Sequence, residues 1–148
     1  MAQVVGQLRA DATSGEILVL DRLKTNLPKD VTVYVETPIY LPRKASHPDF
    51  IILTNYGFVI LEVKDWRNFI ADRHFAYLKT REGEKRHSNP VTQARDYALD
   101  LTNVIGRLAE KKKTRCPRIP YGYAVVFPFF PGYEKTSLQD VWGESFVL

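Results

Sequence analysis

The sequence predicts a single α/β domain built around a mixed β-sheet. Two runs rich in β-branched residues, 49–54 and 58–64, flank Asn-Tyr-Gly in the pattern of a β-hairpin. Further along, an Asn-Pro pair at 89–90 begins a long amphipathic pattern that is typical of a helix. The 148 residues, of which 45% are hydrophobic and 26% charged, are enough for one hydrophobic core and too few for two.

The first third of the chain is expected to hold a helix and a strand. Thr13 is a suitable N-cap and Glu16 follows it at the spacing of a capping box, so a helix should begin here and end at 26–28. The apolar stripe of this helix consists of Ile17, Leu20, Leu23 and Leu27. Alternating apolar residues predict a strand over 31–40, and a basic loop is expected at 42–48.

The hairpin and the long helix follow, and the last predicted element is again a strand. The predicted elements after the hairpin are, in order, a short strand at 75–79, a polar turn at 81–85, a helix capped by Ser88 or Asn89 and running to about Lys113, and a strand at 121–127. The apolar face of the long helix consists of Ala94, Tyr97, Leu101, Ile105 and Leu108. Beyond Pro128 no element is predicted. The order αβββ(β)αβ indicates helices packed around a mixed sheet.

The register of the hairpin brings two acidic residues together. If 54–57 forms a four-residue turn, Leu53 lies opposite Phe58, and pairing outward places Asp49 opposite Glu62. Residues directly opposed across two strands share one face of the sheet. A shift of one residue would put the two acids on opposite faces, so this register is a premise that the structure tests.

The chemistry of the predicted pair suits a divalent cation. Asp49 and Glu62 offer hard oxygen ligands of the kind that Mg²⁺ or Mn²⁺ prefers, and the Val63 carbonyl between Glu62 and Lys64 could add another. The ammonium of Lys64 could orient a water molecule or stabilise charge on a phosphate. A Glu-x-Lys pair alone is commonly a surface ion pair of little consequence. Here the strand face is apolar at Phe58 and charged at Lys64, as at a cleft beside a core.

These residues resemble a known family. The stretch from Asp49 to Trp66, followed by Asn-Pro-Val-Thr-Gln-Ala-Arg-Asp-Tyr at 89–97, resembles the nuclease-related domain, NERD. This family belongs to the PD-(D/E)xK nuclease superfamily, which includes many restriction and repair endonucleases. The resemblance implies an αβββαβ restriction-endonuclease-like core with a central mixed β-sheet flanked by helices. It also implies that Asp49 and Glu62 bind metal and that Lys64 is the catalytic lysine.

The resemblance implies roles for three further residues. Glu16 matches the acidic residue of the first helix, which often assists metal binding, and so becomes a further catalytic and metal-binding candidate. Gln93 and Tyr97 match a Gln-x-x-x-Tyr element that is expected to line the cleft and contact nucleic acid. Two alternatives stay open: Glu16 could serve as a helix-cap residue, and Gln93 as a hydrogen-bonded core amide.

The charge distribution weakly favours contacts with phosphate. The net charge is +4 and the pI is near 9.2, which permits binding to a polyanion without requiring it. Basic clusters lie at 43–44, 79–87 and 111–115. Candidate contacts to nucleic acid are Arg43, Lys44, Lys85 and Arg86. The alternative for each cluster is a solvated loop or a cation-rich helix end.

The resulting hypothesis is a Mg²⁺- or Mn²⁺-dependent nuclease that hydrolyses DNA. The alternative is a non-catalytic nucleic-acid-binding domain that steers an attached enzyme such as a helicase. Members of this family often occur as N-terminal domains fused to helicases, kinases or zinc-binding domains. The apolar end at Leu148 fits residues 1–148 forming such a domain, with a helicase-like partner either fused or associated.

Several other classes of protein are disfavoured. The single Cys116 excludes an internal disulfide and a cysteine-only metal cluster, and fits a free thiol in a reducing cytosol. His74 and His87 do not stand at ligand spacing with the acids, so a zinc hydrolase is unsupported. No run approaches the roughly 18 apolar residues of a membrane span, and no secretory signal begins the chain. We therefore expect a cytoplasmic location and no membrane partner.

Overall fold

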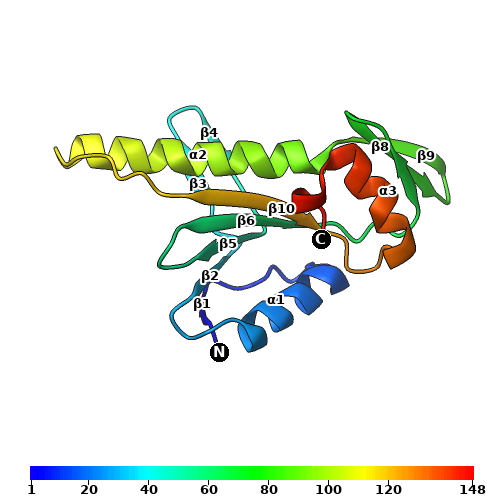
Figure 1. The fold of residues 1–148 in the computed structure, drawn as a ribbon, viewed down its shortest axis with the longest axis horizontal. Helices are drawn as coiled ribbons and strands as arrows, with labels where there is room; N and C mark the ends of the chain where they lie inside the picture. Colours follow the sequence, from blue (N-terminus) through cyan, green and yellow to red (C-terminus); the bar gives the residue numbers. More distant parts are fainter.

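The computed structural model describes residues 1–148, the side chain of Tyr133 excepted. It is a mixed α/β domain with a central mixed sheet and helices on both faces, as predicted (Figure 1). The elements in chain order are β1 (Gln3–Val5), α1 (Ser14–Asn26), β2 (Thr32–Val35), β3 (Ile39–Leu41), β4 (Lys44–Ser46), β5 (Phe50–Leu53), β6 (Phe58–Val63), β7 (Phe69–Ala71), β8 (Phe75–Thr80), β9 (Gly83–Ser88), α2 (Pro90–Lys111), β10 (Tyr121–Val126), α3 (Gly132–Trp142) and the 3₁₀ turn η1 (Glu144–Phe146).

The central sheet has five strands in the order β1-β2-β5-β6-β10. β2, β5 and β6 pair in antiparallel fashion, whereas β1 with β2 and β6 with β10 are parallel. A parallel pair needs a long crossover connection. α1 lies within the first crossover and α2 within the second, so the two helices cover opposite faces of the sheet (Figure 1).

The register predicted for the hairpin is confirmed. Leu53 lies opposite Phe58 and Ile51 lies opposite Ile60. Gly57 ends the turn at a place with no room for a side chain, because an added Cβ would overlap the backbone that enters β10. The turn chemistry and the packing of the next strand therefore select the same register.

Two hydrophobic clusters, one on each face of the sheet, follow from alternation along β6. Phe58 and Ile60 point to the face that α2 covers, and both are almost fully buried. Leu61 and Val63 point to the opposite face and pack with Val19 of α1. Glu62 points to the same face as Phe58 and Ile60. It lies near the end of β6, two residues before the charged Lys64.

The N-terminus of α1 is held by the residue that follows Lys64. Thr13 and Glu16 form the predicted capping box. In addition, the Asp65 carboxylate accepts hydrogen bonds from the Gly15 N–H (3.1 Å), the Thr13 hydroxyl (3.2 Å) and the Ser14 hydroxyl (3.3 Å). This clamp joins the start of α1 to the end of β6.

The predicted stripe of α1 is wrong at its first position. Ile17 is 56% exposed, whereas Glu16 and Val19 are buried. The Asp65 clamp turns Gly15 and Glu16 toward the sheet, so Glu16, and not Ile17, stands at the head of the face that continues through Leu20 and Leu23. A charged residue thus occupies a place where apolar periodicity alone would put isoleucine.

The predicted strand over 31–40 is two strands. Val33 and Val35 are buried as expected, but the chain turns away at Glu36, whose φ is +49°. β3 and β4 then form a separate hairpin that includes most of the expected basic loop. Val35 pairs with Phe50, and Glu36 still donates its N–H to the Asp49 carbonyl, but the positive φ of Glu36 then turns the chain out of the sheet.

The segment 81–85 and the helix α3 were not predicted correctly. The polar segment 81–85 is a short turn followed by the start of β9, which pairs with β8 along its length. Its residues are exposed, so no apolar alternation marked it as a strand. α3 was not predicted at all. It packs into an aromatic cluster formed by Phe69, Phe127, Phe130 and Trp142.

The long helix α2 is capped as predicted and reaches beyond the sheet. Asn89 accepts a hydrogen bond from the Val91 N–H (2.9 Å), and the helix ends at Lys111. Ala94 and Ala98, both fully buried, let it lie close to the sheet. Leu108 is 51% exposed, because the C-terminal part projects past the strands (Figure 1). No helix among the described residues is long and apolar enough to cross a membrane.

Two helical glycines should respond oppositely to substitution by alanine. A Cβ at Gly15 would overlap the Asp65 carboxylate, so Gly15→Ala should lower the free energy of unfolding by about 1–3 kcal/mol. A Cβ at Gly106 of α2 would make an ordinary contact with Cys116, so Gly106→Ala should raise it by about 0.5–1 kcal/mol. Urea unfolding measures both. Equal effects of the two substitutions would contradict the clamp.

Candidate active site

Asp49 and Glu62 are cross-bonded between the two strands of the hairpin. The backbone N–H of Asp49 donates to Glu62 Oε1 (2.9 Å). The backbone N–H of Val63 donates to Asp49 Oδ2 (2.8 Å). Each acid is therefore held by the backbone of the opposite strand. The structure brings the two carboxylates side by side, where the sequence placed them.

Burial makes these acids hold their protons unusually tightly. Glu62 is 3% exposed. Burial raises the pKa of Asp49 to about 6, and the charge of Glu16 adds to the rise. Burial, followed by the charge of Asp49, raises the pKa of Glu62 to about 8. The hydrogen bonds from the backbone and the charge of Lys64 oppose both shifts without cancelling them.

Lys64 acts on both acids without forming an ion pair with either. Lys64 follows Glu62 by two residues and so lies on the same face of the sheet, and its positive charge lowers the pKa of Asp49 and of Glu62. Its Nζ lies 5.9 Å from the centre of the Trp66 ring, and its backbone N–H donates to Val126 of β10 (2.9 Å). A charge held by an aromatic face, with no carboxylate within 4 Å among the described residues, is left available to a ligand.

Glu16 lies near the pair but serves the helix cap. Its Oε2 accepts a hydrogen bond from the Thr13 N–H (2.7 Å), and Oε1 lies 3.9 Å from Arg9. Its charge raises the pKa values of Asp49 and Glu62. In the described part of the chain, no group of three or more His, Cys, Asp or Glu side chains is placed to hold a metal ion. The capping role left open by the sequence is thus the one that Glu16 performs here.

Oxygen atoms suitable for a cation remain at the end of the hairpin. The described hydrogen bonds use Asp49 Oδ2 and Glu62 Oε1 and leave the second oxygen of each carboxylate. The Val63 N–H points toward the β5 edge, and in an extended strand the carbonyl of a residue points to the same edge as its N–H. Two carboxylate oxygens and one carbonyl are hard donors, which fit Mg²⁺ or Mn²⁺.

Gln93 and Tyr97 form a pair beside the acids. Gln93 Nε2 donates to the Tyr97 hydroxyl (2.8 Å), and both side chains are half-buried. The pKa of Tyr97 is raised by burial and also by the charges of Glu62, Asp49 and Asp100, so the hydroxyl lies within the electrostatic reach of the acids. The pair also lines a polar cavity of about 460 Å³ between α2 and the β3–β4 hairpin.

The four predicted basic contacts are not equivalent. Lys44 pairs with Asp100 of α2 (3.1 Å) and helps to fasten the β3–β4 hairpin, next to which Arg43 is exposed. Arg86 lies over the Phe75 ring at 4.5 Å. Lys85 lies two residues from His87 along β9, so both side chains are on one face of the strand, and the His87 ring lies 5.2 Å from the Trp66 ring.

Two further residues support the site and carried no motif in the sequence. Glu36 donates its backbone N–H to the Asp49 carbonyl (2.9 Å) and accepts from the Arg9 N–H (2.8 Å). Arg9 Nε lies 3.0 Å from Glu36 Oε1, an ion pair without hydrogen-bond geometry. Arg9 and Glu36 are far apart in sequence, so no spacing linked them. Asp65 and Trp66, in contrast, directly follow Lys64 and could have been singled out.

Comparison with known proteins identifies the family. The sequence profile of the nuclease-related domain, NERD, matches residues 12–128. The chain belongs to this family. No curated protein and no solved structure matches it. The family resemblance inferred from the sequence is thereby confirmed, and the matched segment of the NERD domain includes Glu16, Asp49, Glu62, Lys64, Gln93 and Tyr97.

The raised pKa values predict that the metal-free NERD domain loses stability as the pH rises. Glu62 shifts from 4.5 to about 8 on folding, so between these values the unfolded chain is ionised while the folded protein keeps its proton. The free energy of unfolding should fall by up to about 1.4 kcal/mol per pH unit across this window.

The glutamine of Glu62→Gln is neutral at every pH, so this variant should keep only the part of the fall that ends near pH 6, which comes from Asp49. Urea unfolding with a chelator at about pH 5 and about pH 8 tests the difference. Glu110→Gln, which removes an exposed acid of α2, should behave like the wild type. Equal pH dependence in the wild type and Glu62→Gln would mean that Glu62 is ionised in the folded protein.

Proposed function

We propose that this NERD domain is a Mg²⁺- or Mn²⁺-dependent nuclease that hydrolyses phosphodiester bonds of DNA. The observation that carries the proposal is the cross-bonded pair of half-buried Asp49 and buried Glu62, both with raised pKa values, beside Lys64. Burying two mutually repelling acids costs stability, and such perturbed groups concentrate at functional sites. The family match supports the same reaction class.

The residues at the end of the hairpin fit the proposed ion. Asp49, Glu62 and the Val63 carbonyl would hold it, and Glu16 would add negative charge from its place in the helix cap. A bound Mg²⁺ or Mn²⁺ would supply Lewis-acid polarisation of the phosphate and a more acidic water molecule. Because Glu62, with its pKa raised to about 8, keeps its proton at neutral pH without metal, binding would release a proton.

Lys64 is the proposed catalytic cation. Its ammonium would orient the attacking water and stabilise the negative charge that develops at phosphorus, an interaction that strengthens in the transition state. The Trp66 ring limits where the ammonium can lie. Gln93 and Tyr97 would contact the nucleic acid next to the scissile bond.

The basic side chains would contribute affinity rather than chemistry. Arg43, Lys85 and Arg86 are exposed and would neutralise phosphates through counterion release. Lys44 would make a weaker contribution, because Asp100 shares its charge. We further propose that α1, β2, β5, β6, α2 and β10 form the αβββαβ restriction-endonuclease-like core, and that a helicase-like domain acts with it.

A second candidate function is a non-catalytic nucleic-acid-binding module that steers an attached enzyme. The engagement of Glu16 in the capping box favours it, because this acid is committed to Thr13 and a third metal-binding carboxylate is then missing from the described cluster. Such a module would bind nucleic acid through the same basic side chains and would have no need of metal.

The metal proposal is tested by Asp49→Asn, which removes the charge and keeps an acceptor for the Val63 N–H. Mn²⁺ binding, measured by calorimetric titration, should be lost, while the free energy of unfolding stays equal or rises because repulsion with Glu62 is relieved. Asp21→Asn, at an exposed position of α1, should bind like the wild type. Unchanged Mn²⁺ affinity in Asp49→Asn would refute the assignment.

The role of Lys64 is tested by single-turnover cleavage at saturating enzyme. Lys64→Ala should keep the fold, Mn²⁺ binding and DNA binding but cleave roughly 10²-fold more slowly, as expected for one electrostatic catalytic group. Lys64→Arg should restore little, because a planar guanidinium does not replace a compact ammonium. Lys24→Ala, on α1, serves as the control.

Two results would overturn these proposals. Wild-type rates in Lys64→Ala would remove its catalytic role and leave a surface lysine worth at most about 1 kcal/mol of stability. No cleavage by the wild type of linear, circular or single-stranded DNA, with either Mg²⁺ or Mn²⁺, would favour the non-catalytic module.

A further inference from the structure

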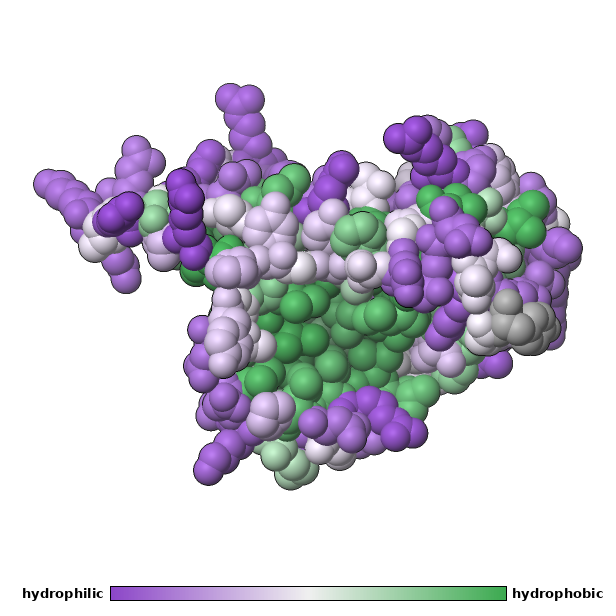
Figure 2. Space-filling model, in the orientation of Figure 1, coloured by the Kyte–Doolittle hydropathy of each residue, from purple (hydrophilic) through white to green (hydrophobic). Residues whose placement is uncertain are grey.

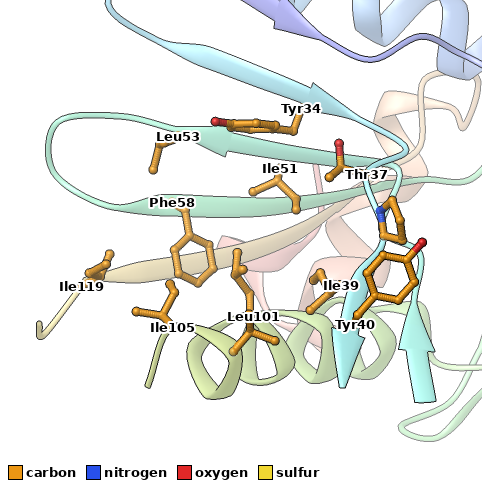
Figure 3. A pocket seen from close by; sticks show the side chains of 12 residues that line it. Tyr34, Thr37, Ile39, Tyr40, Ile51, Leu53, Phe58, Leu101, Ile105 and Ile119 are labelled. Carbon is orange, nitrogen blue, oxygen red and sulfur yellow. The ribbon is translucent and has the colours of Figure 1, made fainter. Parts of the chain in front are cut away.

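α2 covers only part of the sheet face on which it packs. α2 packs on β6 and β10 and leaves the neighbouring part of β5 and β2 open. The result is a groove of about 390 Å³ between the helix and the sheet (Figure 3). Its principal walls are Tyr34, Ile51, Leu53, Phe58, Leu101 and Ile105.

The groove is apolar and open to solvent. No charged side chain lines it, and the hydroxyl groups of Tyr34, Thr37 and Tyr40 are its polar side-chain atoms. Leu101 and Ile105 of α2 face Phe58 and the strand residues across the hollow (Figure 3). Figure 2 shows a separate hydrophobic hollow beside α1, on the other face of the sheet, whereas the groove under α2 is a continuous apolar surface of its own. A contiguous apolar surface of this kind on a globular domain marks an interaction site.

A run of positive charge borders one end of the groove. The five cations of this run are Lys111, Lys112, Lys113, Arg115 and Arg118, with no acid among them, and all are exposed. The run leads directly into Ile119, which lines the groove. Leu108, half exposed on the projecting end of α2, lies between the groove residue Ile105 and the first lysine. Apolar surface and positive charge therefore adjoin on one helix end.

We propose that this groove binds an amphipathic helix of a partner protein, with apolar residues along one face and Asp or Glu residues at the end that meets the 111–118 run. A helix lying beside α2 would complete the helical layer over β5 and β2. Its leucine-like side chains would fill the apolar hollow, and its acids would meet the cations. The proposal does not depend on nuclease activity.

Two other occupants suit the groove less well. An unstacked base would leave polar edges against aliphatic walls, and Tyr40, 73% exposed, is the lining aromatic residue with a broadly accessible ring. A second copy of the chain would bring a second 111–118 run toward the first, and ten cations near one another repel.

The probe for the test is a synthetic helical peptide of about 20 residues, long enough to form a helix. It carries leucine at i, i+3, i+4 and i+7 and glutamates at one end; its control has the same composition with the leucines scrambled. Methyl NMR of the complete 148-residue chain should show shifts for Ile51, Ile105 and Ile119, which line the groove, and none for Ile17 or Ile70.

Matched variants separate the apolar and charged contributions. Leu53→Glu, at a groove position 40% exposed, should weaken peptide binding roughly tenfold or more, and Leu99→Glu, 41% exposed outside the groove, should leave it unchanged. Lys112→Gln with Lys113→Gln should weaken binding and flatten its salt dependence. Lys24→Gln with Lys29→Gln removes equal charge from the region of α1 and should have no effect.

Any of the following outcomes would overturn the proposal. These are absence of groove methyl shifts in the wild type, equal binding of the scrambled peptide, or equal losses in the groove and control variants. A wild-type dimer that Leu53→Glu dissociates would assign the groove to a second copy. Loss of single-stranded DNA binding in Leu53→Glu, with peptide binding intact, would assign it to nucleic acid, and shifts caused by anionic vesicles alone would assign it to a lipid surface.

Discussion

The pairing of β5 with β6 is the constraint on which both the core and the candidate site depend. Because side chains alternate across a strand, opposing Ile51 with Ile60 also decides which face receives Glu62. A slip of one residue would turn Ile60 toward α1 and Leu61 toward α2, exchanging the contents of two closely packed clusters. The hydrophobic effect thus enforces a register that places two acids together, although the acids themselves oppose it.

The site is held by contacts that reach it from several parts of the chain. Asp65 ties the end of β6 to the first turn of α1, which fixes where Glu16 lies. Glu36 leaves β2 in an unusual backbone conformation and bonds the Asp49 carbonyl. Such strain at a position that supports buried acids is typical of functional sites, where the surrounding structure over-determines the conformation. Residues proposed to take part in the chemistry and residues that hold them in place therefore alternate along the sequence.

Sequence reasoning succeeded where one local rule decided the outcome. The Thr13 capping box, the Asn89-Pro90 helix start and the alternation along β6 each depend on near neighbours in sequence. The predictions were wrong where contacts between residues distant in the sequence determine the structure. Ile17 is exposed because Asp65 sets the rotation of α1, and β2 ends after Val35 because Glu36 adopts a positive φ that turns the chain out of the sheet. The exposed strand β9 and the weakly capped helix α3 carry little pattern of their own and depend on tertiary packing.

The unit that folds is longer than the segment that matches the family. The match ends at residue 128, but Val147 is fully buried beside Val125, and Phe127 donates its N–H to the Leu148 carbonyl (2.9 Å). Trp142 donates to the Asp72 carbonyl (2.7 Å) and shields the aromatic cluster around Phe69. A protein truncated at residue 128 would therefore expose the apolar surface of this aromatic cluster, which favours aggregation over folding. The packing of this domain thus extends past the end of the family match by at least the roughly three turns of α3 and the 3₁₀ turn η1.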